Sequence, residues 1–268
     1  MNDNSLFKVE KQGFVTSLVL SRPEKRNAMN IEVFEGLREH FSRFDEDPEV
    51  RVVVIKAEGK SFTAGLDLSS LAGLLQSTTA DARETLRQTI RKGQECLTAV
   101  EQCKKPVIAA VHGYCIGAGV DLLCACDIRL ATRDAVFSVR ETRMAMVADL
   151  GTLQRLPHII GEAWFRELAF SGRDFSAEEA LEIHFITHIY EDQASLQREA
   201  GNLANEIAMC SPLAVQGVKD VMRFNREHGL QAGLEYVAQK NAAILISEDL
   251  MEAVQAFMEK RPPQFKGK

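Results

Sequence analysis

The stretch PVIAAVHGYCIGAGVDLLCACDIRLAT, residues 106–132, decides the fold. The continuous apolar run within residues 105–113 is typical of a strand that is buried on both faces of a sheet. A glycine-bearing turn is predicted at residues 114–119 and a short helix at residues 120–127, and the next strand is predicted at residues 128–138. Strand, turn, helix and strand in this order predict an α/β core.

The same alternation appears upstream of this stretch. Residues 17–23 (SLVLSRP) predict a strand that ends at a turn, and residues 50–57 (VRVVVIKA) predict a second buried strand. Between them, residues 30–48 predict an amphipathic helix, because its apolar residues recur near helical spacing. The expected apolar face of that helix consists of Val33, Phe34, Leu37, Phe41 and Phe44.

The pattern changes after about residue 195. Residues 196–225 and 230–261 both show helix periodicity, and no strand is predicted between them. The apolar stripes of these helices need partners. We therefore expect a core over residues 1–200 and a helical region for packing or assembly over residues 201–268.

Composition and charge exclude several classes of protein. The 268 residues are 46% hydrophobic and 26% charged, as in ordinary globular chains, and the net charge is −6. Nucleic acids and anionic membranes are disfavoured as partners because their binders are normally basic. No apolar run approaches the ~20 residues of a membrane span, and neither end carries a recognisable targeting signal. These features predict a cytoplasmic protein.

Two groupings of potential metal ligands have a simpler interpretation. Cys124 and Cys126 lie in an apolar run without a second cysteine pair at zinc-site spacing, so we expect buried, reduced thiols. His184 and His188 are four residues apart, but the segment lacks the glutamate of a zinc helix. Its β-branched and aromatic residues predict a strand that separates the two rings. No metal site is expected.

A short motif occurs twice. Residues 64–68 read AGLDL and residues 118–122 read AGVDL, and each follows a buried strand and is predicted to open a helix. Such a turn exposes backbone N–H groups, and two turns side by side would form a two-donor oxyanion hole. The alternative is a pair of ordinary tight turns. A dinucleotide-binding turn is excluded, because Leu122 stands where the third glycine would be required.

The chain resembles the crotonase (enoyl-CoA hydratase/isomerase) superfamily over essentially its full length. The resemblance lies in six segments, at residues 21–30, 61–68, 106–132, 151–161, 175–182 and 256–268. It implies an α/β spiral of ββα repeats with a helical C-terminal trimerisation region, assembled as a trimer or a dimer of trimers. It also implies an acyl-CoA thioester substrate, in which coenzyme A is part of the substrate, and no other cofactor and no metal.

The resemblance also assigns binding residues. The thioester oxygen would accept hydrogen bonds from the N–H groups of Ala64 and Ala118, and the coenzyme A moiety would pass Arg26 and Ala28. The remaining substrate-binding residues belong to the two repeated turns and are Gly65, Leu66, Asp67, Leu68 and Gly119.

Three acids indicate the subfamily. Asp121 and Glu141 match the two glutamates of enoyl-CoA hydratases, and Asp149 stands where hydratases carry glycine. This set resembles the Δ3,5-Δ2,4-dienoyl-CoA isomerases of fatty-acid β-oxidation. Their reaction removes a proton at C2 and returns one at C6, which is too far for one carboxylate. Apolar surroundings, and repulsion from Asp121, would raise the pKa of the exchanging acids.

Each acid also has a structural interpretation. Asp121 could be an ordinary acid at a helix N-terminus, and Asp149 could cap the next helix. Glu141 could pair with Arg140 or with Arg143, which would lower its pKa. Two other functions remain open: an enoyl-CoA hydratase that uses Asp121 and Glu141, and a non-catalytic scaffold that binds acyl-CoA or RNA.

Overall fold

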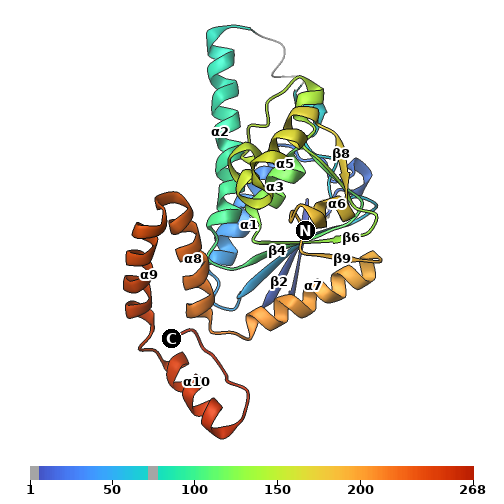
Figure 1. Ribbon diagram of the computed structural model, residues 1–268. Helices are drawn as coiled ribbons and strands as arrows, with labels where there is room; N and C mark the ends of the chain where they lie inside the picture. Colours follow the sequence, from blue (N-terminus) through green and yellow to red (C-terminus); the bar gives the residue numbers. More distant parts are fainter. Residues whose placement is uncertain (1–5, 72–77) are drawn as a thin grey trace.

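A computed structural model describes residues 6–71 and 78–268, and it has the mixed α/β architecture that the sequence predicts (Figure 1). The main sheet has the order β1-β2-β3-β4-β6-β9. Its strands are β1 (Phe7–Gln12), β2 (Val15–Leu20), β3 (Val52–Ala57), β4 (Val107–Val111), β6 (Ile128–Thr132) and β9 (His188–Tyr190). Only β1 and β2 pair antiparallel; the other neighbours are parallel. A second sheet consists of β5 (Tyr114–Ile116), β7 (Val136–Ser138) and β8 (Asp174–Ser176).

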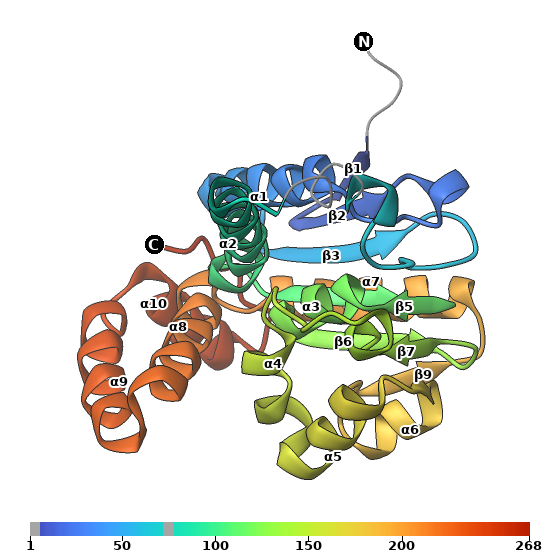
Figure 2. The ribbon, with the colours of Figure 1, turned by 90° about the horizontal axis from the view of Figure 1, so that it is seen from above.

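Helices cover both faces of the main sheet (Figures 1 and 2). On one face, α7 (Gln193–Ala208) packs Leu196 and a row of alanines against strand residues such as Val54 and Ile108. On the other face lie α1 (Ile31–Glu46), α2 (Ala80–Gln102) and α3 (Ala118–Ala125). Burial on both faces explains why β3 and β4 are continuously apolar.

The predicted amphipathic helix is confirmed as α1. Its buried residues are the five predicted ones, Val33, Phe34, Leu37, Phe41 and Phe44. The Asn30 side chain accepts a hydrogen bond from the Val33 N–H at 3.2 Å, which satisfies one donor at the start of this helix. The predicted short helix is confirmed as α3, which is buried along its whole length.

Two predicted elements differ from the structure. Residues 114–116, predicted as part of a turn, form β5, which pairs with β7. The strand predicted over residues 128–138 is two strands, because the chain turns at Arg133–Ala135, where the Ala135 N–H donates to the Thr132 carbonyl at 3.0 Å. Both differences have one cause: the chain leaves the main sheet twice to build the second sheet.

The two cysteines and the two histidines lie in different surroundings. Cys124 and Cys126 are buried free thiols, as predicted. His188 opens β9, but His184 is not in a strand; it has φ +64° just after α6 (Ala177–Glu182). Within residues 6–71 and 78–268, no group of three or more His, Cys, Asp or Glu side chains could hold a metal ion.

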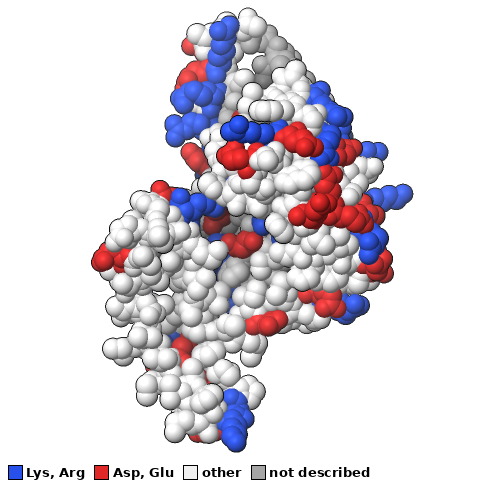
Figure 3. Space-filling view, in the orientation of Figure 1, with Lys and Arg blue, Asp and Glu red and all other residues white. Residues whose placement is uncertain are grey.

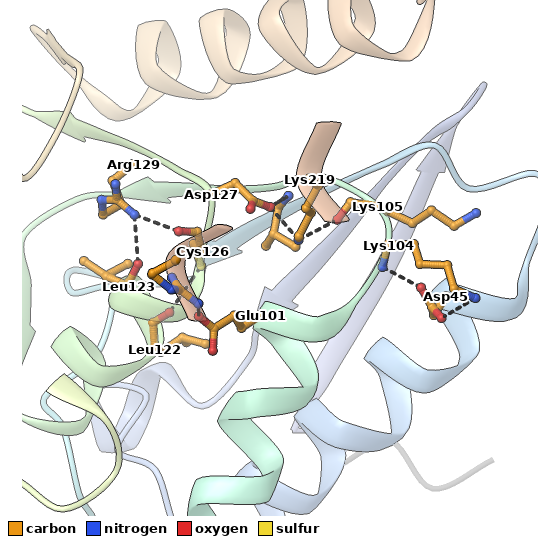
Figure 4. A network of polar contacts seen from close by, with 12 residues as sticks. Asp45, Glu101, Lys104, Lys105, Leu122, Leu123, Cys126, Asp127, Arg129 and Lys219 are labelled. Carbon is orange, nitrogen blue, oxygen red and sulfur yellow. Dashed lines mark hydrogen bonds and ion pairs between the residues drawn. The ribbon is translucent and has the colours of Figure 1, made fainter. Parts of the chain in front are cut away.

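The C-terminal helices extend away from the sheets (Figure 1). They are α8 (Pro212–His228), α9 (Leu230–Ile244) and α10 (Glu248–Glu259). Lys219 of α8 is hydrogen-bonded to Asp127 at 2.7 Å and to the Lys105 carbonyl at 3.0 Å, which ties this region to the core (Figure 4). The predicted boundary at residue 200 lies within α7, and the division into core and assembly region stays a prediction.

The remaining helices connect these elements. They are α4 (Thr152–Arg155), α5 (Pro157–Ser171) and the 3-10 helices η1 (Pro23–Lys25), η2 (Leu68–Leu71) and η4 (Glu141–Met144). The first AGLDL repeat thus opens only the 3-10 helix η2, and the segment that follows lies outside the described residues. In the described part of the chain, no helix has the length and apolar character to cross a bilayer.

Candidate active site

The two AG[LV]DL turns lie side by side. Thr63 and Cys115 form a parallel bridge, in which the Thr63 N–H donates to the Tyr114 carbonyl at 3.0 Å. Gly65 has φ +87°, and a Cβ atom there would lie 2.5 Å from the Ile116 carbonyl oxygen and 3.6 Å from the Ala118 nitrogen. Only glycine allows this close approach of the two backbones.

One N–H group of this junction belongs to the second turn. Ala118 is the first residue of α3, so its N–H has no acceptor within the helix. The N–H forms no hydrogen bond with any described residue. A ligand oxygen at this point would also lie at the positive end of the α3 dipole.

The other available N–H group belongs to Leu66, not to Ala64. The N–H of Ala64 donates to the Arg26 carbonyl at 2.9 Å, so the predicted donor is already occupied. Met29 pairs with the first turn by accepting from the Asp67 N–H at 2.9 Å and donating to the Gly65 carbonyl at 2.8 Å. This pattern turns the Leu66 N–H away from Met29, and it has no acceptor among the described residues.

Glu141 lies against the second turn. Its Oε1 atom is 3.1 Å from the position that a Cβ atom on Gly117 would take. Its Oε2 atom is buried without a hydrogen-bond partner in the described part of the chain. Burial, together with the charges of Asp121 and Asp149, raises the pKa of Glu141 to about 7. A carboxyl with this pKa can both take up and release a proton near neutral pH.

The neighbouring arginines do not neutralise Glu141. Arg140 forms an ion pair with Asp174. Arg143 donates from Nε to the Ser171 carbonyl at 2.8 Å, at the end of α5. The expectation that Arg143 could pair with Glu141 and lower its pKa is therefore wrong, because the guanidinium faces a different helix.

Asp121 is buried, and one of its carboxylate oxygens already accepts a hydrogen bond. It is 1% exposed, and its Oδ1 atom accepts from the Thr152 N–H at 2.6 Å, which fixes the start of α4. Its pKa is raised to about 6, mainly by burial and also by the charge of Asp149, while the hydrogen bonds from Thr152 act in the opposite direction. Asp121 therefore supports the segment that carries Asp149 and also adds negative charge to the site.

Asp149 does not cap α4. The N-cap residue of that helix is Gly151, which has no side chain to accept a hydrogen bond. The N–H of Thr152, the first residue of the helix, donates to Asp121 instead. Asp149 is exposed, and its carboxylate forms no hydrogen bond with another described residue. Burial still raises its pKa. The site therefore holds Glu141 and Asp149 as two acids with raised pKa values, and neither forms an ion pair with a described Lys or Arg.

The other predicted binding residues surround the first turn. Asp67 pairs with Arg22 at 3.5 Å, and Arg22 donates to the Ala28 carbonyl at 2.7 Å, so Arg22 links the first turn to the segment of Ala28. A hydrogen bond from the Ser69 side chain is the largest of several contacts that lower the pKa of Asp67.

The remaining predicted binding residues have different surroundings. Arg26 and Leu68 are exposed, and Gly119 packs closely on Thr63 and Cys115. Their contact with a substrate stays a prediction. The sequence contains no pattern that indicates the role of Arg22 or the available N–H of Leu66, because both depend on pairing between distant segments.

Comparisons with known proteins give matches over nearly the whole chain. The profile of the family described as enoyl-CoA hydratase/isomerase matches residues 10–268. The chain is 45% identical over 256 residues to a peroxisomal Δ3,5-Δ2,4-dienoyl-CoA isomerase of Arabidopsis thaliana, covering 94% of this chain and 92% of that protein. It is 43% identical over 265 residues to the mitochondrial isomerase of Mus musculus, covering 97% of this chain and 81% of that protein. The solved structure of an enoyl-CoA hydratase from Bacillus anthracis superposes on this chain with a TM-score of 0.92 at 31% identity. The superposition covers 98% of this chain and 100% of the hydratase.

The relatives correct one expectation and establish the family. The predicted cytoplasmic location is wrong, since the similar isomerases are named as peroxisomal or mitochondrial proteins. The prediction rested on missing address signals, and a missing signal carries no positive information. The fold, the paired turns and the family profile lead to one assignment: the chain belongs to the enoyl-CoA hydratase/isomerase (crotonase) family.

Proposed function

We propose that this protein isomerises 3,5-dienoyl-CoA to 2,4-dienoyl-CoA by proton transfer between carboxyl groups and the substrate. The observation that carries the proposal is the pair of unneutralised acids, Glu141 and Asp149, beside the junction of the two turns. Relatives named as dienoyl-CoA isomerases, at 40–45% identity, support the same reaction. An isomerase of this kind would act in the β-oxidation of unsaturated fatty acids.

The mechanism needs a base, an acid and an oxyanion site. One carboxylate removes a proton at C2, and the electron pair is delocalised onto the thioester oxygen and along the diene to C6, in a conjugated trienolate. The N–H groups of Leu66 and Ala118 are placed to hold that oxygen, and their stabilisation is greatest when it carries charge. The second carboxyl then delivers a proton at C6, four bonds from C2, and the electrons return to form the 2,4-diene.

The rest of the substrate extends from this centre. The coenzyme A moiety would pass Arg26 and Ala28, with Gly65, Leu66, Asp67, Leu68 and Gly119 forming the walls near the thioester. In this assignment coenzyme A is part of the substrate, and proton transfer between carboxyl groups needs no further cofactor.

Enoyl-CoA hydratase is the second candidate. It is favoured by the presence of acids at 121 and 141 and by the similarity to the hydratase of Bacillus anthracis. A hydratase would use both acids to activate water. However, one oxygen of Asp121 already accepts the Thr152 N–H, and Asp149 would have no role in hydration.

A direct assay separates the two candidates. The purified protein is incubated with 3,5-dienoyl-CoA and, in parallel, with 2-enoyl-CoA, and the ultraviolet absorbance of each reaction is followed. The isomerase proposal expects the conjugated 2,4-diene to appear at a much higher kcat/KM than that for hydration. Hydration that is faster than isomerisation would support the hydratase instead.

The oxyanion site gives a first prediction. The Ala118→Pro substitution deletes the N–H at the first position of α3, where proline is compatible with a helix. Loss of one oxyanion donor should lower kcat by roughly 10²–10³. Circular dichroism should show an intact fold. Full turnover in a folded Ala118→Pro protein would mean that the thioester oxygen binds elsewhere.

The exposed apolar face of the C-terminal helices gives a second prediction. Ile246, Phe257 and Met258 are 95%, 84% and 78% exposed, and the surface over α8–α10 in Figure 3 carries few charges. Such a surface normally marks an interface. We expect a trimer or a dimer of trimers in light scattering, and Phe257→Glu should shift the population toward smaller species. A wild-type monomer at micromolar concentration would contradict this assignment.

A further inference from the structure

Helix α2 reaches the backbone of the proposed catalytic acid Asp149. The side-chain amide of Gln94 donates from Nε2 to the Asp149 carbonyl oxygen at 2.6 Å, across 55 positions of sequence. Asp149 lies in an irregular segment between η4 and α4, so no helix or strand fixes its backbone. The hydrogen bond from Gln94 is therefore a direct restraint on this residue.

The residue after Asp149 is held from the same helix. A Cβ atom on Gly93 would lie 2.9 Å from Leu150 Cδ2, so α2 packs closely on the Leu150 side chain. The Leu150 carbonyl accepts from Arg155 Nη1 at 3.3 Å. Two adjacent peptide carbonyls, at residues 149 and 150, are thus restrained by side chains.

Arg155 is itself fixed by α2. Its Nε atom donates to Glu101 at 2.9 Å and its Nη2 atom to Thr98 at 3.1 Å. Glu101 also pairs with Arg226 of α8, and its side chain is only 16% exposed. Both arginines of this cluster are paired with Glu101, so the cluster anchors α4 through groups that already have partners.

We propose that Gln94 is a positioning residue for the isomerisation, and that it acts by holding the Asp149 backbone so that the carboxyl reaches one end of the diene. This inference rests on the proposed function, since it assigns a proton-transfer role to Asp149. Gln94 is exposed and contributes little to the core, so its contact with the Asp149 carbonyl is its main tertiary interaction. A donor at this point restrains position without touching the substrate.

The Gln94→Met substitution tests the proposal because methionine keeps the length and the helix propensity but removes the donor. A displacement of about 1 Å at a reacting group can lower the rate by up to 10²-fold. We expect kcat for 3,5-dienoyl-CoA to fall between about tenfold and 100-fold, with KM nearly unchanged, because the thioester is held by other residues. Gln88→Met is the matched control: Gln88 lies on the same helix and bonds only to Glu84.

A double-mutant cycle with Asp149→Asn makes the test specific. If Gln94 acts through the Asp149 carboxyl, Gln94→Met should cause no further loss of kcat in the Asp149→Asn background. Equal losses in both backgrounds, or wild-type kcat in the single Gln94→Met variant, would overturn the inference and leave the proposed function intact. Wild-type kcat in the single Asp149→Asn variant would overturn both the inference and the proton-transfer role of Asp149 on which it rests, whereas absence of isomerisation in the wild-type protein would overturn the proposed function itself.

Discussion

The Glu141→Gln variant should lose roughly 10²–10⁴ in kcat for 3,5-dienoyl-CoA, the usual contribution of a general acid–base group. Glutamine keeps the shape of the side chain but cannot exchange the proton. The wild-type enzyme should show an ionisation near pH 7 in kcat/KM, because the pKa of Glu141 is raised to about 7. This ionisation should be missing from the residual activity of the variant. Steady-state kinetics from pH 5 to about pH 9 measures both effects.

The same substitution should stabilise the protein at alkaline pH. The folded-state pKa of Glu141, about 7, lies above the ordinary value of 4.5, so the folded protein binds the proton more tightly than the unfolded chain does. The contribution of Glu141 to the stability of the wild type therefore decreases as the pH rises from 4.5 to about 7, and the Glu141→Gln variant has no such decrease. Relative to wild type, the variant should gain at most about 3 kcal/mol between low pH and pH 8, measured by urea unfolding.

A surface glutamate provides the control for both measurements. Glu182 is exposed at the end of α6, so Glu182→Gln should change neither the rate nor the pH dependence of stability. An inactive Glu141→Gln protein that is less stable than wild type at every pH would indicate a structural role for Glu141. Wild-type turnover in Glu141→Gln would remove this residue from the mechanism.

The sequence predicted the fold well in segments where the apolar residues follow one clear helix or strand pattern. The apolar face of α1 and the double-sided burial of β3 follow directly from helical spacing and from a continuous β-branched run. The three-residue strand β5 could not be predicted, because its partner β7 is 20 residues away and the pairing lies in a second sheet. A strand of that length has too few residues to show a period.

The site was predictable in its residue types and less so in its contacts. The repeated AG[LV]DL motif indicated that two turns share one role, and the structure places Gly65 against residues 116–118. The motif could not show that Ala64 is paired with Arg26, since that bond depends on a turn 38 positions earlier in the chain. For the same reason, the sequence suggested a pairing of Arg143 with Glu141, whereas the guanidinium bonds to Ser171. A side chain can form its hydrogen bond with a neighbour in sequence or with a residue of a distant segment, and which of the two it contacts depends on the fold.

The Asp149→Asn variant should lose roughly 10²–10⁴ in kcat for dienoyl-CoA isomerisation, with little change in acyl-CoA affinity. Asparagine matches the shape and hydrogen-bonding capacity of aspartate but cannot transfer the proton. The thioester would still be held by the N–H groups of Leu66 and Ala118, to which the Asp149 side chain does not contribute. Turnover by ultraviolet absorbance and Kd by calorimetry with a product analogue measure the two quantities separately.

Asp149→Asn also separates isomerase from hydratase and catalysis from structure. A hydratase that uses Asp121 and Glu141 would not need Asp149, so any hydration of 2-enoyl-CoA should survive the substitution while isomerisation is lost. A structural role is already disfavoured by the geometry, because Asp121 and not Asp149 takes the Thr152 N–H at the start of α4. Asp121→Asn is the informative comparison: it alters a buried group that accepts the Thr152 N–H, so it should change the stability of the fold as well as the rate, whereas Asp149→Asn, at an exposed carboxyl, should act mainly on the rate. Isomerisation at the wild-type rate in Asp149→Asn would remove Asp149 from the mechanism, and the assignment of proton transfer to the pair Glu141 and Asp149 would lose its basis.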